Sequence, residues 1–320
     1  MKKYISKITA LVAAAGIAAA AGINAAAEGN SLVVLGDSIT SGYGLEGYIS
    51  GDNYSAPQSF ANQFGAAYSD YQNFAVDGRT SGELLTALED ENISAALSGA
   101  DTVVVSIGGN DFLQPMINSV ISLFTENSEL LEEFQNGEIT DPEEYLDIMR
   151  EFTDAMTEAA NSVDTTATGE NLRGILGRIS ELSPDCQTIL LTVYNPFEGV
   201  EGMELLDVTA REKLAELNAE ITAAAEEYGA QTADIFTAFK GNAEGYTNIS
   251  SMDIHPNKDG HALIYSILSE MTGTTEIPAE ETMQPAAPSK GSPDTGAESI
   301  AVFIGAAALA AAGIFASKHK

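Results

Sequence analysis

The sequence predicts an α/β protein in which helices cover both faces of a parallel β-sheet. From Asn30 to about Gly273, short apolar runs alternate with longer amphipathic ones. Short apolar runs are typical of strands buried on both faces, and their alternation with helices is typical of parallel sheets. A stretch of roughly 240 residues corresponds to a single domain.

Five apolar runs are the expected strands: Leu32 to Leu35, Tyr71 to Ala75, Thr102 to Ile107, Thr188 to Val193 and Gln231 to Ile235. Amphipathic stretches are the expected helices, and several follow helix-starting residues such as Ser81 or the Asp141-Pro142 pair. These helices lie near Pro57 to Ala67, Ser81 to Leu88, Asn118 to Thr125, Glu143 to Asn161, Asn171 to Glu181, Val208 to Tyr228 and Lys258 to Met271.

The segment from about Phe112 to Asn171 is long for one crossover connection, so we expect it to add helices beside or above the carboxyl edge of the sheet. Such an insertion is either an active-site cap or an accessory helical layer, and the sequence leaves both open. Six of its apolar side chains could line an apolar binding pocket, although such residues more often pack between helices. They are Met116, Phe124, Phe134, Met149, Phe152 and Met156.

The charge of the chain excludes several classes of partner. Its 320 residues include 47 Asp plus Glu against 14 Lys plus Arg, a formal net charge of −33. A surface this negative repels phosphate backbones and anionic lipids, so we expect no nucleic-acid partner and no peripheral attachment to an anionic membrane. The hydrophobic content of 44% also excludes a disordered acidic tail.

Cysteine and histidine are scarce. A single cysteine, Cys186, cannot form an intramolecular disulfide, and no Cys/His cluster has the spacing of a zinc site. The only histidines are His255, His261 and His319, so any histidine-based catalysis has to use one of them.

The first 27 residues are typical of a secretory signal peptide. Basic residues from Met1 to Lys7 lead into the apolar stretch Ile8 to Ile23, which is followed by the small residues Ala25-Ala26-Ala27. This order of a basic region, an apolar run and a small-residue site predicts export and a mature chain that starts near Glu28. The folded domain is then expected over residues 28–273.

The other end of the chain resembles the cell-wall sorting signal of Gram-positive surface proteins. The stretch Ser299 to Ser317 has no charged residue, is long enough to span a bilayer and precedes Lys318-His319-Lys320. Before it stands Ser292-Pro293-Asp294-Thr295-Gly296, where the family motif has leucine in the first position. The resemblance implies a sortase as processing partner, with plain membrane anchoring as the alternative. Thr274 to Gly291 is a proline-containing linker in composition.

Polar residues follow four of the expected strands. They are Gly36-Asp37-Ser38-Ile39, Val76-Asp77-Gly78-Arg79-Thr80, Gly108-Gly109-Asn110-Asp111 and Asp253-Ile254-His255-Pro256. In open parallel sheets ligands bind at the carboxyl ends of the strands, so these four groups are the candidate functional residues.

Ser38 is the candidate nucleophile, because a serine on a tight turn between strand and helix is exposed to substrate and needs only a base to take its proton. His255 is the candidate base and Asp253 the carboxylate that orients its ring. The oxyanion of the tetrahedral intermediate needs donors, which the backbone N–H groups of Ser38 and Gly78 and the side-chain amide of Asn110 can provide.

Together, these blocks resemble the SGNH hydrolase superfamily, also called the GDSL esterases and lipases, over Val33 to His261. The resemblance implies a three-layer α/β/α sandwich with a flavodoxin-like sheet, ester hydrolysis through an acyl-enzyme, and no metal or organic cofactor. It implies Ser38 as nucleophile, Gly78 and Asn110 as oxyanion donors and His255 as base.

One feature departs from the family pattern. The family commonly places its aspartate three residues before the histidine, where this chain has Met252. Either Asp253 reaches the ring of His255 from two residues away, or a backbone carbonyl orients the ring instead.

Other functions stay open at this point. A two-metal phosphoesterase also uses Asp, Asn and His at strand ends, but usually with more histidines. The Gly-x-Ser-x-Gly elbow of another hydrolase class is absent, since Thr40 stands two residues after Ser38.

Asp37 and Asp111 are expected to form turns or support the site, and Tyr43, Tyr48 and Tyr54 either line the cleft or are half-buried. A surface-anchored binding module on a hydrolase scaffold is the alternative from a different class. The substrate, whether an acylated glycan, a lipid or a small ester, and the oligomeric state cannot be read from the sequence.

Overall fold

A computed structural model of the protein describes residues 30–49, 55–126, 142–201, 203–251 and 253–274. The expected signal peptide, sorting signal and apolar segment Ser299 to Ser317 lie outside these ranges, as do Tyr54 and His319. No helix within the described ranges is long and apolar enough to cross a membrane.

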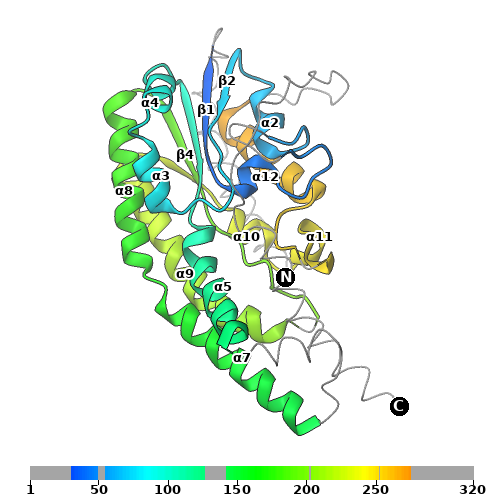
Figure 1. Ribbon diagram of the computed structural model, residues 1–320. Helices are drawn as coiled ribbons and strands as arrows, with labels where there is room; N and C mark the ends of the chain where they lie inside the picture. Colours follow the sequence, from blue (N-terminus) through cyan, green and yellow to red (C-terminus); the bar gives the residue numbers. More distant parts are fainter. Residues whose placement is uncertain (1–29, 50–54, 127–141, 202, 252, 275–320) are drawn as a thin grey trace, which may run out of the picture.

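Five parallel strands form one sheet in the order β2-β1-β3-β4-β5 (Figure 1). The strands are β1 (Ser31–Gly36), β2 (Asp70–Asn73), β3 (Thr102–Ser106), β4 (Gln187–Leu191) and β5 (Gln231–Ala233). All five expected strands are present, and the predicted parallel α/β fold is confirmed. Four of the strands, β2, β3, β4 and β5, end one or two residues earlier than the sequence predicted.

Alternating side chains of the central strands enter two separate cores. Val33 and Leu35 of β1 face one core, whereas Leu32 and Val34 face the other. Burial of both faces explains why the strands are apolar along their whole length instead of alternating with polar residues.

Helices cover the two faces as two outer layers (Figure 1). One face carries α2 (Phe60–Gly65) and α12 (Lys258–Thr272), and the other carries α3 (Ser81–Ala87), α4 (Glu91–Ser98), α8 (Thr165–Leu182) and α9 (Glu204–Glu227). Four short elements follow the strands at their carboxyl ends: α1 (Ser38–Ser41), α10 (Ile235–Phe239), α11 (Ala243–Tyr246) and the 3-10 turn η1 (Ile249–Ser251). Neither α4 nor these short elements were predicted from the sequence.

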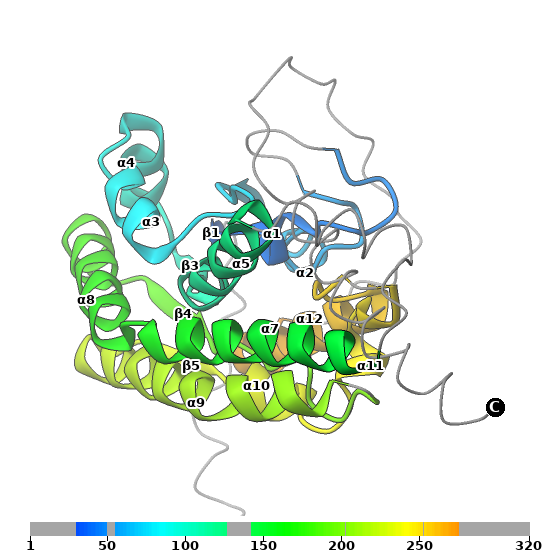
Figure 2. The same ribbon diagram turned by 60° about the horizontal axis from the view of Figure 1, so that its bottom comes forward.

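Two helices, α5 (Gly109–Glu126) and α7 (Pro142–Ser162), extend past the carboxyl edge of the sheet (Figures 1 and 2). The expected extra helices therefore lie at the expected edge, but the predicted start of the first one at Asn118 was wrong. The helix begins nine residues earlier, at Gly109, and continues through Pro115. Phe112 and Met116, one helical turn apart, are both buried in the core and hold this first part of α5 in place.

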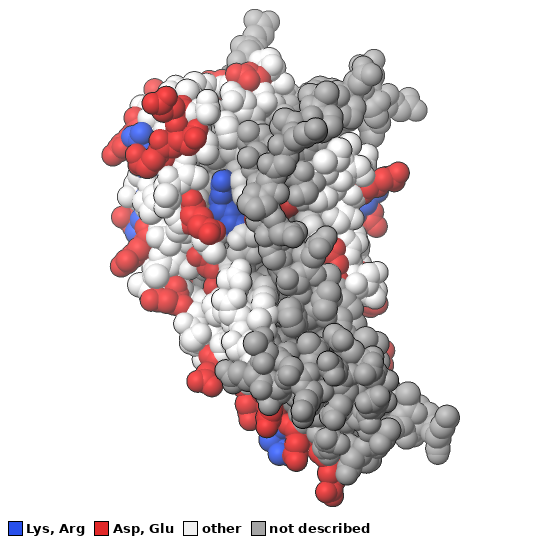
Figure 3. Space-filling model, viewed as in Figure 1, with Lys and Arg blue, Asp and Glu red and all other residues white. Residues whose placement is uncertain are grey.

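The helix expected from Asn171 also begins earlier, at Thr165, because the side chain of Asp164 accepts a hydrogen bond from the Ala167 backbone N–H at 3.0 Å and caps it. On the surface seen in Figure 3, acidic side chains outnumber basic ones, as the net charge requires.

Candidate active site

Ser38 lies at the first position of α1, directly beyond the end of β1. Asp37 caps this short helix by accepting a hydrogen bond from the Ile39 backbone N–H at 3.0 Å. The turn requires glycine at position 36, since a Cβ there would lie 2.1 Å from Thr40 Oγ1 and 2.7 Å from the Ser106 carbonyl oxygen. The sequence Gly-Asp-Ser thus places the serine at the amino end of a helix at the carboxyl edge of the sheet.

His255 lies in the loop between η1 and α12, and its ring contacts Ser38. Its Nε2 atom is 2.9 Å from Ser38 Oγ, and its Nδ1 atom is 2.5 Å from Asp253 Oδ1. The carboxylate also accepts a hydrogen bond from the His255 backbone N–H at 3.0 Å. Asp253 therefore reaches the ring from two residues away, and the alternative of an orienting backbone carbonyl does not apply.

The protonation state of Asp253 fits this contact. Burial alone would raise the pKa of its carboxyl group, but the hydrogen bonds and charge of His255, with a further hydrogen bond from the Asn248 side chain, lower the pKa below its usual value. The carboxylate is consequently ionised at neutral pH and able to stabilise a protonated imidazole.

Backbone contacts on both sides fix the loop that carries His255. The Tyr194 hydroxyl donates to the Ile254 carbonyl at 2.7 Å, and the Asn248 backbone N–H donates to the His255 carbonyl at 2.9 Å. The Tyr43 ring lies against the imidazole with a centroid distance of 4.6 Å. Tyr194 was not predicted from the sequence as a site residue, although it directly follows the fourth expected strand. The end of that strand was the one at which no candidate functional residue was identified.

The expected oxyanion donors are close together in the structure. Asn110 is in the first turn of α5, and its Nδ2 atom donates to Arg79 O at 3.0 Å and to Asp37 Oδ2 at 3.3 Å. Asn110 therefore contacts Arg79, the residue after Gly78, and Asp37, the residue before Ser38. Gly78 has a φ of +75°, and a Cβ there would meet nothing within 4 Å, so its backbone borders open space.

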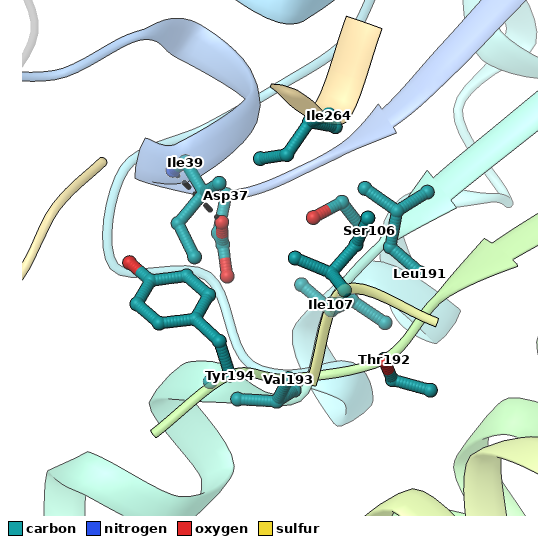
Figure 4. A pocket seen from close by; sticks show the side chains of 11 residues that line it. Asp37, Ile39, Ser106, Ile107, Leu191, Thr192, Val193, Tyr194 and Ile264 are labelled. Atoms are coloured by element: carbon teal, nitrogen blue, oxygen red, sulfur yellow. Dashed lines mark hydrogen bonds between the residues drawn. The ribbon is translucent and has the colours of Figure 1, made fainter. Parts of the chain in front are cut away.

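Asp37 is the most perturbed carboxyl group near Ser38. Burial raises its pKa to about 7, with smaller raising effects from Asp77 and Asp111, while the Ile39 N–H and His255 act in the opposite direction. It faces a small cavity with room for about one water molecule, lined also by Ser106, Thr192 and Tyr194 (Figure 4).

The second described histidine does not belong to the site. The His261 ring is buried between α12 and α2, where Nδ1 accepts a hydrogen bond from the Phe60 backbone N–H at 3.1 Å. Burial, together with the charge of His255, lowers its pKa to about 3, so the ring is neutral. Over the described residues, no group of three or more His, Cys, Asp or Glu side chains is arranged to hold a metal ion.

In this parallel α/β sandwich, a serine is hydrogen-bonded to a histidine, and the histidine is hydrogen-bonded to a carboxylate. This arrangement defines the class of serine hydrolases. Residues 34–263 match the GDSL-like Lipase/Acylhydrolase family, and the chain belongs to this family. The protein is therefore a serine ester hydrolase.

Known relatives are distant in sequence. The chain is 23% identical over 259 residues to the uncharacterized protein YpmR of Bacillus subtilis (strain 168), a match that covers 78% of this chain and 84% of that protein. Among solved structures, it resembles phospholipase A1 from Streptomyces albidoflavus NA297 with a TM-score of 0.53 and 19% identity, covering 76% of this chain and 99% of that one. The lipase Lip_vut3 from a goat rumen metagenome has a TM-score of 0.52 and 19% identity, covering 77% and 98%. At these identities the structures support the fold alone.

Proposed function

We propose that the protein is an extracellular serine esterase that hydrolyses carboxylic esters through an acyl-serine intermediate. The observation that carries this proposal is the continuous contact from Ser38 Oγ through the His255 ring to Asp253. In this scheme Ser38 is the nucleophile, His255 the general base and Asp253 the group that orients and stabilises the imidazolium.

Acylation begins when Ser38 Oγ attacks the ester carbonyl carbon while His255 Nε2 takes the serine proton. The hydrogen bond from Nδ1–H to Asp253 leaves Nε2 unprotonated and so available as the acceptor. The backbone N–H groups of Ser38 and Gly78 and the Asn110 amide stabilise the negative oxygen of the tetrahedral intermediate. The imidazolium then protonates the leaving alcohol as the carbon–oxygen bond breaks.

Deacylation repeats these steps with water. His255 takes a proton from a water molecule, the resulting hydroxide attacks the acyl carbon, and Ser38 leaves with the proton returned by His255. For Asn110 to serve the oxyanion, one of its N–H groups has to turn toward substrate. The contact to Asp37, at 3.3 Å, is the longer of its two hydrogen bonds and therefore the easier one to give up.

The location is proposed from the two ends of the sequence. A signal peptide over residues 1–27 and a sorting signal over 292–320 favour a protein held at the cell surface by a linker, with substrates outside the cell. Acylated glycans, lipids and small esters all occur there. In a Gram-positive host, digestion of the cell wall with a muramidase should release the protein covalently joined to wall fragments. Thr295→Ala should prevent this covalent attachment. Recovery of the unaltered protein only with the membrane fraction would favour the anchor alternative.

Hydrolysis of a p-nitrophenyl ester series from acetyl to long acyl chains, with the full-length protein, tests the activity. Ser38→Ala should lower kcat by about a million-fold, whereas Ser269→Ala should retain activity. Ser269 is a buried serine of α12 whose hydroxyl has no partner within the described part of the chain, so it controls for the loss of a serine as such.

The acyl chain preferred by the wild-type protein then separates acetyl from long-chain substrates. Equal rates for wild type and Ser38→Ala would refute the proposed nucleophile. A folded protein without turnover on any ester of the series, and without labelling of Ser38 by a fluorophosphonate, would favour the binding module.

A further inference from the structure

The loop between β2 and α3 carries Gly78, and two carboxylates anchor this loop. Directly before Gly78, Asp77 accepts a hydrogen bond from Ser41 Oγ at 2.6 Å and a second one from the Tyr48 hydroxyl. Ser41 is buried at the end of α1, the short helix that begins with Ser38. This contact joins the middle of the loop, next to Gly78, to the helix that carries the nucleophile.

At the end of the loop, the Asp111 side chain of α5 binds Ser81, the first residue of α3. Its carboxylate accepts from the Ser81 backbone N–H at 2.8 Å and from Ser81 Oγ at 2.5 Å. The Asn171 side chain of α8 donates to the same serine oxygen at 3.0 Å, and Thr168 Oγ1 lies 3.4 Å from Asp111 Oδ1. Ser81 is fully buried, so the end of the loop is fixed to α5 and α8 together.

Gly78 itself has no side chain to hold it and lies in a turn that the Arg79 backbone N–H closes by donating to the Val76 carbonyl at 3.2 Å. The direction of its N–H group is therefore set by this turn together with the anchors on either side. Two carboxylates so close to a developing oxyanion are electrostatically unfavourable. What a carboxylate offers in return is the capacity to accept several hydrogen bonds at once, and Asp77 and Asp111 each accept at least two.

We propose that Asp77 and Asp111 are positioning residues, which hold the Gly78 N–H and the Asn110 amide at the separation that the oxyanion requires. This inference rests on the proposed esterase function. Removing the charge of either carboxylate has one of two effects. If the carboxylate positions the donors, the variant enzyme is slower; if it only repels the developing oxyanion, the variant enzyme is faster.

The test is the kinetics of Asp77→Asn and Asp111→Asn on the best p-nitrophenyl ester. Each should lower kcat about 10-fold and the corresponding alanine variants about 100-fold, because small displacements of a catalytic donor have effects of this size. KM should change less than about two-fold, since ground-state binding does not need the donors. Affinity for an arylboronic acid, which forms a tetrahedral adduct on the serine, should fall in parallel with kcat/KM.

Partner variants and a matched control complete the design. Ser81→Ala should slow the enzyme and be non-additive with Asp111→Asn, because both remove the same contact. Asp90 caps α4 by accepting from the Asn92 backbone N–H at 2.8 Å. Since α4 leads into the amino end of β3 and the site lies at the carboxyl edge of the sheet, Asp90→Asn should lower Tm while leaving kcat unchanged.

An unchanged or higher kcat in both aspartate-to-asparagine variants would overturn the inference, as would equal losses in Asp90→Asn. Failure of the proposed function itself is visible separately, as activity that survives Ser38→Ala.

Discussion

Asp253 Oδ1 and His255 Nδ1 lie 2.5 Å apart, although the two residues are separated by only one position in the chain. The turn that allows this also lets the same carboxylate accept the His255 backbone N–H at 3.0 Å. The spacing that departs from the family pattern thus still gives a carboxylate on the ring nitrogen that faces away from Ser38.

This contact predicts that Asp253→Asn lowers kcat by at least about 100-fold, because an asparagine amide can donate to Nδ1 and thereby stabilise the wrong ring tautomer. His255→Ala should cost more, since it removes the base itself. Steady-state kinetics of both variants on one ester measure the difference. A loss of less than five-fold for Asp253→Asn would show that the carboxylate is dispensable.

Tyr194→Phe is expected to weaken the support of the His255 loop. The variant keeps the ring stacked on Phe239 at a centroid distance of 4.6 Å but loses the 2.7 Å hydrogen bond to the Ile254 carbonyl. An unsatisfied buried carbonyl costs about 1–3 kcal/mol of unfolding free energy, and kcat should fall several-fold as the imidazole loses its fixed position.

Tyr246, whose ring also lies against Phe239, provides the matched control for Tyr194→Phe. Tyr246→Phe should leave kcat unchanged. Urea denaturation and ester kinetics of the two variants, measured together, check the prediction. Equal kcat values for Tyr194→Phe and wild type would show that the Tyr194 hydroxyl does not support the loop.

The sheet and the contact between Ser38 and His255 could be predicted from the sequence because each depends on short patterns. Continuous apolar runs such as Thr102 to Ile107 identify buried strands, and polar residues just after them identify the carboxyl edge. The separation of 217 positions between Ser38 and His255 does not matter for this inference, because parallel topology brings the carboxyl ends of all the strands to one edge.

The start of α5 and the tyrosine on the His255 loop could not be predicted in the same way. Gly109 and Pro115 are unfavourable inside a helix, and the tertiary burial of Phe112 and Met116 outweighs them. The bond from Tyr194 to the Ile254 carbonyl joins two loops 60 residues apart, and no local pattern encodes it.

Asp37 should make the folded state less stable as the pH rises. Its pKa is about 7 in the folded protein and 3.8 as an ordinary aspartate, so between these values the unfolded chain releases a proton that the folded one retains. Stability is therefore lost as the pH rises through this window, by up to about 1.4 kcal/mol per pH unit. Asp37→Asn lacks this titration.

For Asp37→Asn the quantity to compare is the slope of stability against pH, and not the stability itself. Asparagine has one acceptor oxygen, so it cannot accept both the Ile39 backbone N–H and the Asn110 amide, as the two oxygens of Asp37 do. Urea unfolding from pH 4.5 to 7 should show a more positive slope for the variant than for wild type. Parallel slopes would mean that Asp37 is already ionised in the folded protein.

His261 should act in the opposite direction over the same range. Its pKa falls from 6.5 to about 3 on folding, so below pH 6.5 the unfolded chain takes up a proton that the buried ring refuses. Stability is lost as the pH falls from 6.5 toward 3, again by up to about 1.4 kcal/mol per pH unit. As the pH of the wild-type protein falls from 6.5 to 3.8, the stability lost through His261 offsets the stability gained through Asp37.

His261→Asn keeps an acceptor for the Phe60 backbone N–H, which His261 Nδ1 accepts at 3.1 Å, but has no proton to take up. Its unfolding free energy should therefore rise relative to wild type as the pH falls from 6.5 to 4.5, the reverse of the trend for Asp37→Asn. Urea titrations of the wild type, the two single variants and the double variant on one pH series measure both slopes. Since the sites are independent in this account, the double variant should return the wild-type slope, and a slope equal to either single variant would contradict it.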